Sequence, residues 1–229
     1  MAEKIICIMR IDDIKEKIPQ SLYTILSGEI ADLRPAQEKA VIAGLLEGKN
    51  LLVCTPTASG KTLIGEIASL KSILEKRGKA IYIVPLKALA SEKFNDFKGR
   101  YGKLIRVALS IGDIDSVDNY LEEYDLIICT AEKLDSLIRH HTPWINSVRV
   151  IIIDEVHMLN DTHRGPTLEI IITILREILR NAQIIALSAT IGNPEELAEW
   201  FGARAVIDEW RPVNLLKGLY FNGEIEFKD

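Results

Sequence analysis

The residues whose types and spacing point most clearly to a chemical role form the run Thr55-Pro56-Thr57-Ala58-Ser59-Gly60-Lys61-Thr62. The run follows the apolar residues 50–54 and opens a stretch of helical period, which is the setting of a phosphate-binding loop. In such a loop, successive backbone N–H groups and a helix N-terminus bind anions. Gly60 lets the backbone come close to phosphate, Lys61 supplies a positive charge and the Thr62 hydroxyl is a ligand for Mg²⁺.

The loop predicts a nucleoside triphosphate with Mg²⁺ as its ligand. The residues expected to contact the phosphates are Thr57, Ala58, Ser59, Gly60, Lys61 and Thr62. The position that usually holds a first glycine is Thr55 here. The alternative is a chance Gly-Lys-Thr at the start of a helix, so a second motif is needed to decide.

A pair of carboxylates supplies that motif, because the apolar residues 150–153 lead into Asp154-Glu155-Val156-His157. A carboxylate at the end of a buried strand beside the phosphate-binding loop can hold Mg²⁺ on ATP, and Asp154 has that position. Glu155 can orient and deprotonate an attacking water. The alternative is an ordinary acidic turn after a strand. The predicted catalytic residues are therefore Lys61, Asp154 and Glu155, with Thr62 and Asp154 as the metal ligands.

The tripeptide Ser188-Ala189-Thr190 follows another apolar run, residues 184–187. Small hydroxyl side chains at the end of a buried strand can hydrogen-bond the acidic motif and sense its state. Ser188 and Thr190 are therefore candidates for coupling. The tripeptide alone occurs by chance, and only its place after the two other motifs makes it informative.

Short elements must position these residues. Apolar runs that do not alternate with polar residues are typical of strands buried on both faces, and they occur at residues 50–54, 80–84, 105–109, 126–129, 148–153, 184–187 and 205–207. Amphipathic stretches separate several of them, at residues 62–76, 167–180 and 194–201. The alternation predicts an α/β fold, a mostly parallel sheet with helices on both faces. We expect an N-terminal arm and helical segment at 1–32, the ATP-binding domain at 33–209 and an exit linker at 210–229.

Composition narrows the class of protein. The chain has 229 residues, of which 48% are hydrophobic, enough for one well-packed domain. No apolar run is long enough to span a bilayer, so a soluble, cytoplasmic protein without a membrane partner is expected. A net charge of −5 argues against nucleic-acid binding by bulk positive charge, but not against a local basic or amide-lined track. Cys7, Cys54 and Cys129 are expected to be buried thiols.

The three motifs, in this order, resemble motifs I, II and III of superfamily 2 helicases. Finer matches are similar to the Ski2-like branch, and within it to the archaeal DNA helicases of the Hjm type. These matches are residues 56–62, Pro85-Leu86-Lys87-Ala88-Leu89-Ala90, Thr130-Ala131-Glu132-Lys133, Arg164-Gly165, residues 188–200 and Trp210-Arg211-Pro212-Val213. The resemblance covers residues 33–219 and implies the first RecA-like domain of an ATP-dependent helicase, a P-loop domain that binds ATP and Mg²⁺.

The resemblance also implies roles for further residues. Gln37 would read the adenine edge, and the alternative is an ordinary polar helix residue. His157 would couple the nucleotide state to the Ser188 motif. Residues that follow strands would contact the nucleic-acid backbone without reading bases, and they are Pro85, Lys87, Thr130, Glu132 and Lys133. The alternative for the two lysines is a solvated surface position.

The sequence departs from the family in two respects. The family has Thr-Gly-Asp or Ser-Gly-Asp where this chain has Ile111-Gly112-Asp113, so the hydroxyl next to Gly112 is missing and Ser110 lies one residue away. Nothing here matches the family's second RecA-like domain, which carries arginine fingers. The chain is therefore expected to be a half-site that needs a second RecA-like domain, in cis or in trans.

In the full protein the resemblance implies an ATP-dependent 3′–5′ DNA helicase that unwinds branched DNA such as stalled forks. The chain by itself is expected to bind Mg-ATP, to contact single-stranded DNA weakly and to hydrolyse slowly. One alternative is an RNA helicase of the same branch, because backbone contacts discriminate poorly between sugars. Another is a non-hydrolysing, nucleotide-dependent binding module that partners a second chain.

Overall fold

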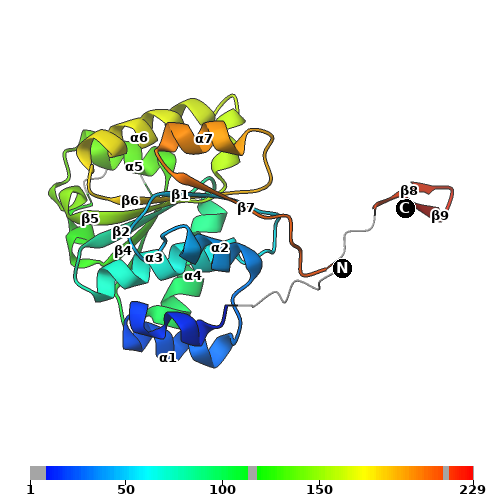
Figure 1. The fold of residues 1–229 in the computed structure, drawn as a ribbon. Helices are drawn as coiled ribbons and strands as arrows, with labels where there is room; N and C mark the ends of the chain where they lie inside the picture. The colour runs from blue at the N-terminus through cyan, green and yellow to red at the C-terminus, as the bar shows by residue number, and fades with distance from the viewer. Residues whose placement is uncertain (1–8, 113–117, 214–216, 229) are drawn as a thin grey trace.

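A single parallel sheet forms the centre of the molecule (Figure 1). The computed structural model describes residues 9–112, 118–213 and 217–228. The seven strands pair in the order β3-β4-β2-β5-β6-β1-β7, and each pairing is parallel. They are β1 (Leu51–Cys54), β2 (Lys79–Val84), β3 (Val107–Ser110), β4 (Leu126–Thr130), β5 (Val148–Ile153), β6 (Gln183–Ser188) and β7 (Arg204–Ile207). Every apolar run that was predicted to be a strand is therefore confirmed.

Helices cover both faces of the sheet, as the alternating pattern predicts (Figure 1). One face carries α1 (Gln20–Glu29), α2 (Pro35–Ile42), α3 (Lys61–Leu74) and α4 (Lys87–Tyr101). The other carries α5 (Ala131–Arg139), α6 (Gly165–Ile178) and α7 (Pro194–Phe201). Short 3-10 helices are η1 (Ile11–Lys17), η2 (Asn119–Glu123), η3 (Pro143–Ser147) and η4 (Val156–Asn160). Each face has its own cluster of buried apolar side chains, so the α/β prediction is confirmed.

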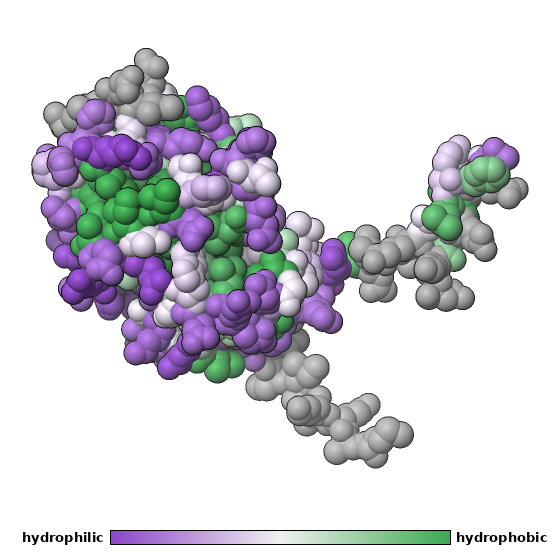
Figure 2. Space-filling model, turned by 90° about the horizontal axis from the view of Figure 1, so that it is seen from above, coloured by the Kyte–Doolittle hydropathy of each residue, from purple (hydrophilic) through white to green (hydrophobic). Residues whose placement is uncertain are grey.

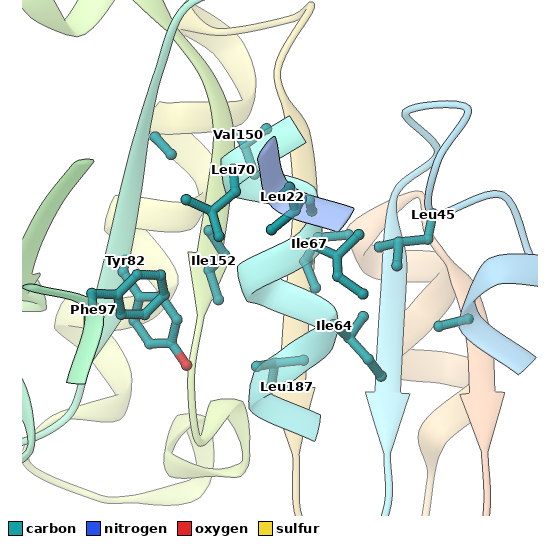
Figure 3. Close-up of a cluster of buried hydrophobic side chains, with 14 of the residues drawn as sticks. Leu22, Leu45, Ile64, Ile67, Leu70, Tyr82, Phe97, Val150, Ile152 and Leu187 are labelled. Atoms are coloured by element: carbon teal, nitrogen blue, oxygen red, sulfur yellow. The ribbon is translucent and has the colours of Figure 1, made fainter. Parts of the chain in front are cut away.

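The helix α3 brings the phosphate-binding loop close to the strand of the acidic motif. Ile64, Ile67 and Leu70 of α3 are buried against the sheet (Figure 3). Gly65 lies on the same helix, and a Cβ there would approach Ile152 of β5 within 3.1 Å. The absence of a side chain at Gly65 therefore allows the helix to pack closely on the strand that ends just before Asp154.

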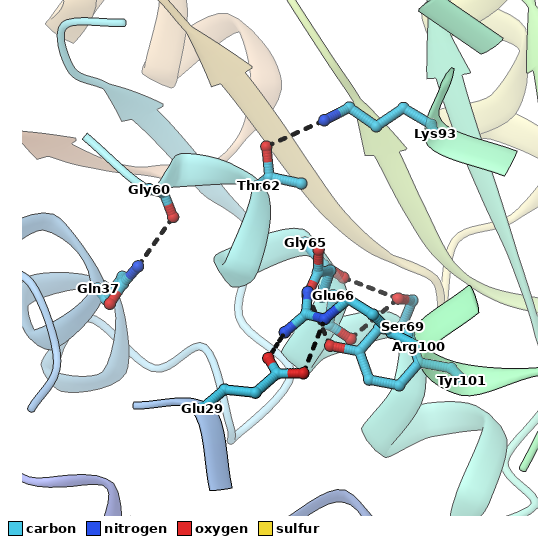
Figure 4. Close-up of polar contacts among 10 residues, drawn as sticks. All are labelled: Glu29, Gln37, Gly60, Thr62, Gly65, Glu66, Ser69, Lys93, Arg100 and Tyr101. Atoms are coloured by element: carbon cyan, nitrogen blue, oxygen red, sulfur yellow. Dashed lines mark hydrogen bonds and ion pairs between the residues drawn. The ribbon is translucent and has the colours of Figure 1, made fainter. Parts of the chain in front are cut away.

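The described part of the N-terminal segment packs as part of the domain. Ile11, Ile14 and Leu22 are buried in the same apolar cluster as α3. Arg100 of α4 binds both Glu29 of α1 and the buried Glu66 of α3 (Figure 4). The segment from residue 9 to 32 is thus tied to the sheet by apolar contacts and by ion pairs. Cys7 lies outside the described residues.

The last described residues form an antiparallel hairpin, β8 (Lys217–Phe221) and β9 (Glu224–Lys228). It lies away from the body of the domain in Figures 1 and 2. Leu219, Tyr220 and Phe221 are each more than 70% exposed, so these apolar side chains bury little surface in this chain. The hairpin lies within residues 210–229, which were expected to be an exit linker, and its strand β9 was not predicted. No helix among the described residues is long and apolar enough to cross a membrane.

Candidate functional site

The carboxyl ends of the parallel strands bring the three motifs together. In the sheet order, β5, β6 and β1 are neighbours, although they are far apart in the chain. Asp154 follows β5, Ser188 ends β6 and Thr55 follows β1. The Thr55 N–H donates to the Ser188 carbonyl at 3.2 Å, which joins the first and third motifs directly. Ligands of open α/β sheets bind at this edge.

The loop after β1 curls around a space for an anion. The hydroxyls of Thr55 and Ser59 are hydrogen-bonded at 2.6 Å and both residues are buried, so Thr55 closes the base of the loop. Ala58 and Gly60 have φ of +63° and +87°. A Cβ on Gly60 would lie 2.6 Å from Nε2 of Gln37. The backbone conformation therefore favours glycine at this position, and a larger residue would also have to displace the end of the Gln37 side chain.

A cavity of about 320 Å³ lies above this loop. Its lining includes the predicted Thr57, Ala58, Gly60, Lys61, Thr62, Asp154 and Glu155, together with Arg34, Leu89, Glu92 and Lys93. Ser59 is buried behind the loop, and its hydroxyl is used by Thr55. The predicted phosphate and metal residues therefore surround one volume, apart from Ser59.

Lys61 and Glu155 form an ion pair across the cavity. Nζ of Lys61 donates to both carboxylate oxygens of Glu155, at 3.0 and 3.1 Å. Lys61 is only 8% exposed, so its charge is largely removed from water and needs a partner. Phosphate oxygens would compete with Glu155 for this lysine. Glu155 itself has a φ of +52°, a conformation that is uncommon outside glycine and is found where a fold must aim a functional side chain.

Asp154 is held by a buried tyrosine. The Tyr82 hydroxyl donates to Oδ2 of Asp154 at 2.9 Å, and the Glu155 N–H donates to Oδ1 at 3.0 Å. Burial raises the pKa of Asp154, and the hydrogen bond from Tyr82 opposes that rise. The tyrosine therefore favours the ionised carboxylate, which is the form that binds a metal ion.

The donor set suits Mg²⁺. Thr62 and Asp154 line the same cavity, and both present oxygen ligands. Among residues 9–112, 118–213 and 217–228, no group of three or more His, Cys, Asp or Glu side chains could hold a metal ion. Mg²⁺ in nucleotide sites is held by one or two protein oxygens, phosphates and water, so a sparse set fits this ion better than one that needs a protein cage.

A second cavity of about 480 Å³ lies at the other half of the same edge, after β2, β3 and β4. Its lining holds all five predicted nucleic-acid residues, Pro85, Lys87, Thr130, Glu132 and Lys133, together with Leu86, Ala88, Ile111, Gly112 and Arg164. Lys87 is exposed and begins α4, so it is free to meet a phosphate. We call this surface the strand-end groove.

The burial of Lys133 overturns the alternative that this lysine has a solvated surface position. It is 2% exposed, and its Nζ lies 3.0 Å from Asp118, so a solvated surface position is wrong for this lysine. Thr130 is also buried, and its hydroxyl caps α5 by accepting from the Lys133 N–H at 3.4 Å. Ser110 donates to Asp118 at 3.0 Å, so its hydroxyl serves this cluster and does not replace the one missing beside Gly112. Asp113 lies outside the described residues.

Comparison with known proteins decides the family. The model of the DEAD/DEAH box helicases matches residues 34–197. The chain belongs to this helicase family. It is 52% identical over 217 residues to the ATP-dependent DNA helicase Hel308 of Pyrococcus abyssi, a match that covers 95% of this chain and 30% of the relative. Identity to the Hel308 of Methanocaldococcus jannaschii is 57% over 205 residues, covering 86% of this chain and 17% of the relative.

A solved structure agrees. The crystal structure of the helicase MrfA bound to DNA matches with a TM-score of 0.74 and 30% identity, and covers 85% of this chain and 30% of that one. The expected RecA-like helicase fold and the resemblance to archaeal DNA helicases are therefore confirmed. The chain spans less than a third of the length of each of these relatives.

The residues predicted to couple the motifs are Ser188, which ends β6, His157, which lies in η4 just after Glu155, and Thr190. The Ser188 hydroxyl is buried and has no hydrogen-bond partner among the described residues. Nδ1 of His157 lies 3.3 Å from Oε2 of Glu155, but the angles are not those of a hydrogen bond. Thr190 is exposed. An orphaned hydroxyl between two motifs is available to a new partner, so the predicted coupling role of Ser188 remains open.

Gln37 of the helicase domain supports the phosphate-binding loop. Its Nε2 donates to the Gly60 carbonyl at 2.9 Å (Figure 4), and its Oε1 accepts from the Arg34 N–H at 2.9 Å. Arg34 in turn donates to the Ala58 carbonyl at 2.8 Å, and its guanidinium lies 5.7 Å from the ring centre of Trp210. Both ends of the Gln37 amide are engaged within the chain, and its contact with adenine stays a prediction.

Several residues of these sites were not assigned roles from the sequence, among them Arg34, Tyr82, Lys93 and Arg164. Tyr82 lies in an apolar strand and reads as a core residue, because only the pairing of β2 with β5 reveals its partner. Lys93 belongs to a helix with many charged residues and carries no distinguishing spacing. The prediction of buried thiols is confirmed for Cys54 and Cys129, and burial raises the pKa of Cys54 to about 11 and that of Cys129 to about 12.

Proposed function

We propose that this chain is the ATP-binding motor domain of an ATP-dependent 3′–5′ DNA helicase that unwinds branched DNA. The observation that carries the proposal is the arrangement of two cavities along one sheet edge, one with the Lys61, Glu155 and Asp154 cluster and the other with the strand-end groove. Nucleotide chemistry and a nucleic-acid track on one rigid sheet are what a motor domain requires. The polarity and the branched substrate rest on the family resemblance.

In the proposed reaction, Lys61 leaves Glu155 for the β- and γ-phosphates of ATP, which frees the Glu155 carboxylate. Glu155 then accepts a proton from water, the water oxygen attacks the γ-phosphorus and the bond to the β–γ bridging oxygen breaks. Mg²⁺, held by Thr62 and Asp154, would supply positive charge to the phosphate oxygens. Backbone N–H groups of residues 57–62 orient the phosphates.

The isolated chain is proposed to be a half-site. Arg34 is the single arginine among the described residues that line the nucleotide cavity, and its guanidinium is bound to Ala58 and Trp210. An arginine finger contributes a factor of roughly a thousand or more to phosphoryl transfer. A second RecA-like domain, in cis or in trans, would have to supply it. Slow hydrolysis by the chain alone follows.

The nucleic-acid partner is proposed to be single-stranded DNA, with RNA as the second candidate. The strand-end groove offers the exposed Lys87, and a lysine that contacts phosphate does not distinguish one sugar from the other. The names of the relatives favour DNA. Competition between single-stranded DNA and RNA of one sequence for the chain would measure the preference.

The first experiment is ATP turnover with and without single-stranded DNA, with Lys61→Ala as the blank and Glu155→Gln as the matched control. We expect Mg-ATP binding that Lys61→Ala abolishes and Glu155→Gln retains, together with slow turnover that DNA barely stimulates. DNA-stimulated turnover well above the blank would contradict the half-site. Retained ATP binding in Lys61→Ala would contradict the nucleotide site itself.

A further inference from the structure

A second lysine, Lys93, lines the same cavity as Lys61, but it comes from a different helix. It lies on α4, and its Nζ is 3.3 Å from Oγ1 of Thr62 (Figure 4). It lines the same cavity as Asp154, and its charge acts on that carboxylate by lowering the pKa. One ammonium group therefore lies near both of the oxygen ligands that Mg²⁺ is expected to use.

The position of Lys93 follows from the charges around it. Asp154 and Glu155 place two carboxylates in a partly buried site, and Lys61 pairs with Glu155 alone. An ammonium group only donates hydrogen bonds, so Lys93 must use a lone pair of the Thr62 oxygen. A metal ion on Thr62 would bind the same oxygen from the same cavity, and a lysine beside a divalent cation is repelled. Lys93 and Mg²⁺ therefore compete for one place.

We propose that Lys93 is a resident cation of the metal-free site: its ammonium group donates to the Thr62 hydroxyl in the cavity that Asp154 also lines, until Mg²⁺ displaces it. The inference rests on the proposed nucleotide function. The competing role is a permanent contact with phosphate, like that of Lys61. The two roles differ in whether the lysine strengthens nucleotide binding when Mg²⁺ is present. A resident cation supports nucleotide binding only without Mg²⁺, whereas a phosphate ligand supports it under both conditions.

The test measures binding of a fluorescent ADP analogue to the whole chain, in EDTA and at increasing Mg²⁺ concentrations. Lys93→Met keeps the aliphatic stem and removes the charge. Lys98→Met is the matched control, because Lys98 lies on the same helix and its Nζ is 5.2 Å from the ring centre of Phe94, outside the cavity. We expect Lys93→Met to weaken metal-free binding about threefold to fivefold, the size of a partly exposed charge interaction. The affinity for the analogue at saturating Mg²⁺ should change less than about twofold. Because nucleotide binding and metal binding are linked, the Mg²⁺ concentration that half-saturates the nucleotide-bound chain should fall by the same factor as the metal-free affinity for the analogue.

Each other outcome overturns the inference. An equal loss of affinity with and without Mg²⁺ would make Lys93 a phosphate ligand, and no change under either condition would make it a surface lysine. If Lys93→Met lost binding because it misfolds, its melting temperature would also fall. Lys93→Arg keeps the charge and would then restore both the affinity for the analogue and the melting temperature. Failure of the proposed function looks different, because the parent chain would not bind the analogue or Lys61→Ala would bind it normally.

Discussion

Replacement of Tyr82 by phenylalanine removes a single hydroxyl that the sequence alone gives no reason to notice. The ring packs edge-on against Phe97, with centroids 5.6 Å apart, and phenylalanine keeps that packing. The loss is the hydrogen bond from the hydroxyl to Oδ2 of Asp154. The substitution is therefore a clean probe of how the acidic motif is held.

The magnitude follows from burial and charge. Tyr82 is fully buried and Asp154 is 8% exposed, so water cannot readily replace the missing donor. A hydrogen bond to a charged group contributes about 1.5–3 kcal/mol, and we expect Tyr82→Phe to lower the free energy of unfolding by about 2 kcal/mol. For a chain of this size that is a fall in melting temperature of about 4–8 °C.

The effect depends on pH in a defined direction. Burial raises the pKa of Asp154 in the folded state, so keeping it ionised lowers stability, and this penalty disappears as acid protonates the group. Tyr82→Phe raises the pKa further. The gap in stability between the parent and the variant is therefore widest at neutral pH and narrows as the pH falls through the folded-state pKa of Asp154.

Thermal and urea unfolding without nucleotide or Mg²⁺ measure the effect. Tyr101→Phe is the matched control, because Tyr101 is equally buried and donates to Glu66 at 2.7 Å, but Glu66 keeps Arg100 as a second partner. We expect the control to lower stability by about 1 kcal/mol. Equal losses in the two variants, or a loss from Tyr82→Phe that does not change with pH, would refute the role assigned to the Asp154 contact.

Three further substitutions test the sites. Gly60→Ala, at a φ of +87° and with its Cβ 2.6 Å from Gln37, should weaken nucleotide binding at least about tenfold in a fluorescence titration, and normal affinity would refute the loop geometry. Lys133→Met should cost about 3 kcal/mol in urea unfolding, because its ion pair with Asp118 is buried; a loss under about 0.5 kcal/mol would restore the surface-lysine reading. Asp154→Asn should raise the melting temperature of the metal-free chain at neutral pH and lose that advantage below the ordinary aspartate pKa of 3.8, whereas an advantage that persists in acid would exclude ionisation as the cause.

Strand positions were predictable from the sequence because burial on both faces leaves a continuous apolar run. Residues 148–153 show this well, since the run and β5 coincide. Motif positions also indicated which residues would lie together, because a loop after β1 and a carboxylate after β5 end at the same sheet edge, and most of the predicted phosphate and metal residues line one cavity there. The hydrophobic pattern thus locates the strands and helices, and the ends of these elements locate the candidate functional residues.

Contacts between elements far apart in the chain were not predictable in the same way. Tyr82 and Asp154 are 72 residues apart, and their contact requires β2 to lie beside β5, which no local pattern specifies. For Lys133 the alternative to a nucleic-acid contact was a solvated surface position, which is wrong because the lysine is buried against Asp118 from a different segment of the chain. The strand β9, which pairs with β8, was missed because its apolar residues are exposed. A short strand without a buried face need not show a recognisable hydrophobic pattern.

The order of the strands suggests how one domain can link its two sites. β5, β6 and β1 end at the nucleotide cavity, and β3, β4 and β2 end at the strand-end groove, so β2 and β5 lie at the boundary. The hydrogen bond from Tyr82 to Asp154 crosses that boundary, and Pro85 follows Tyr82 by three residues on the same strand end. A change in the charge balance at Asp154 on metal binding therefore acts on the strand that precedes Pro85 and Lys87, two of the residues predicted to contact nucleic acid. If this path matters, Tyr82→Phe should alter how strongly nucleotide changes DNA affinity, while leaving DNA affinity without nucleotide unchanged.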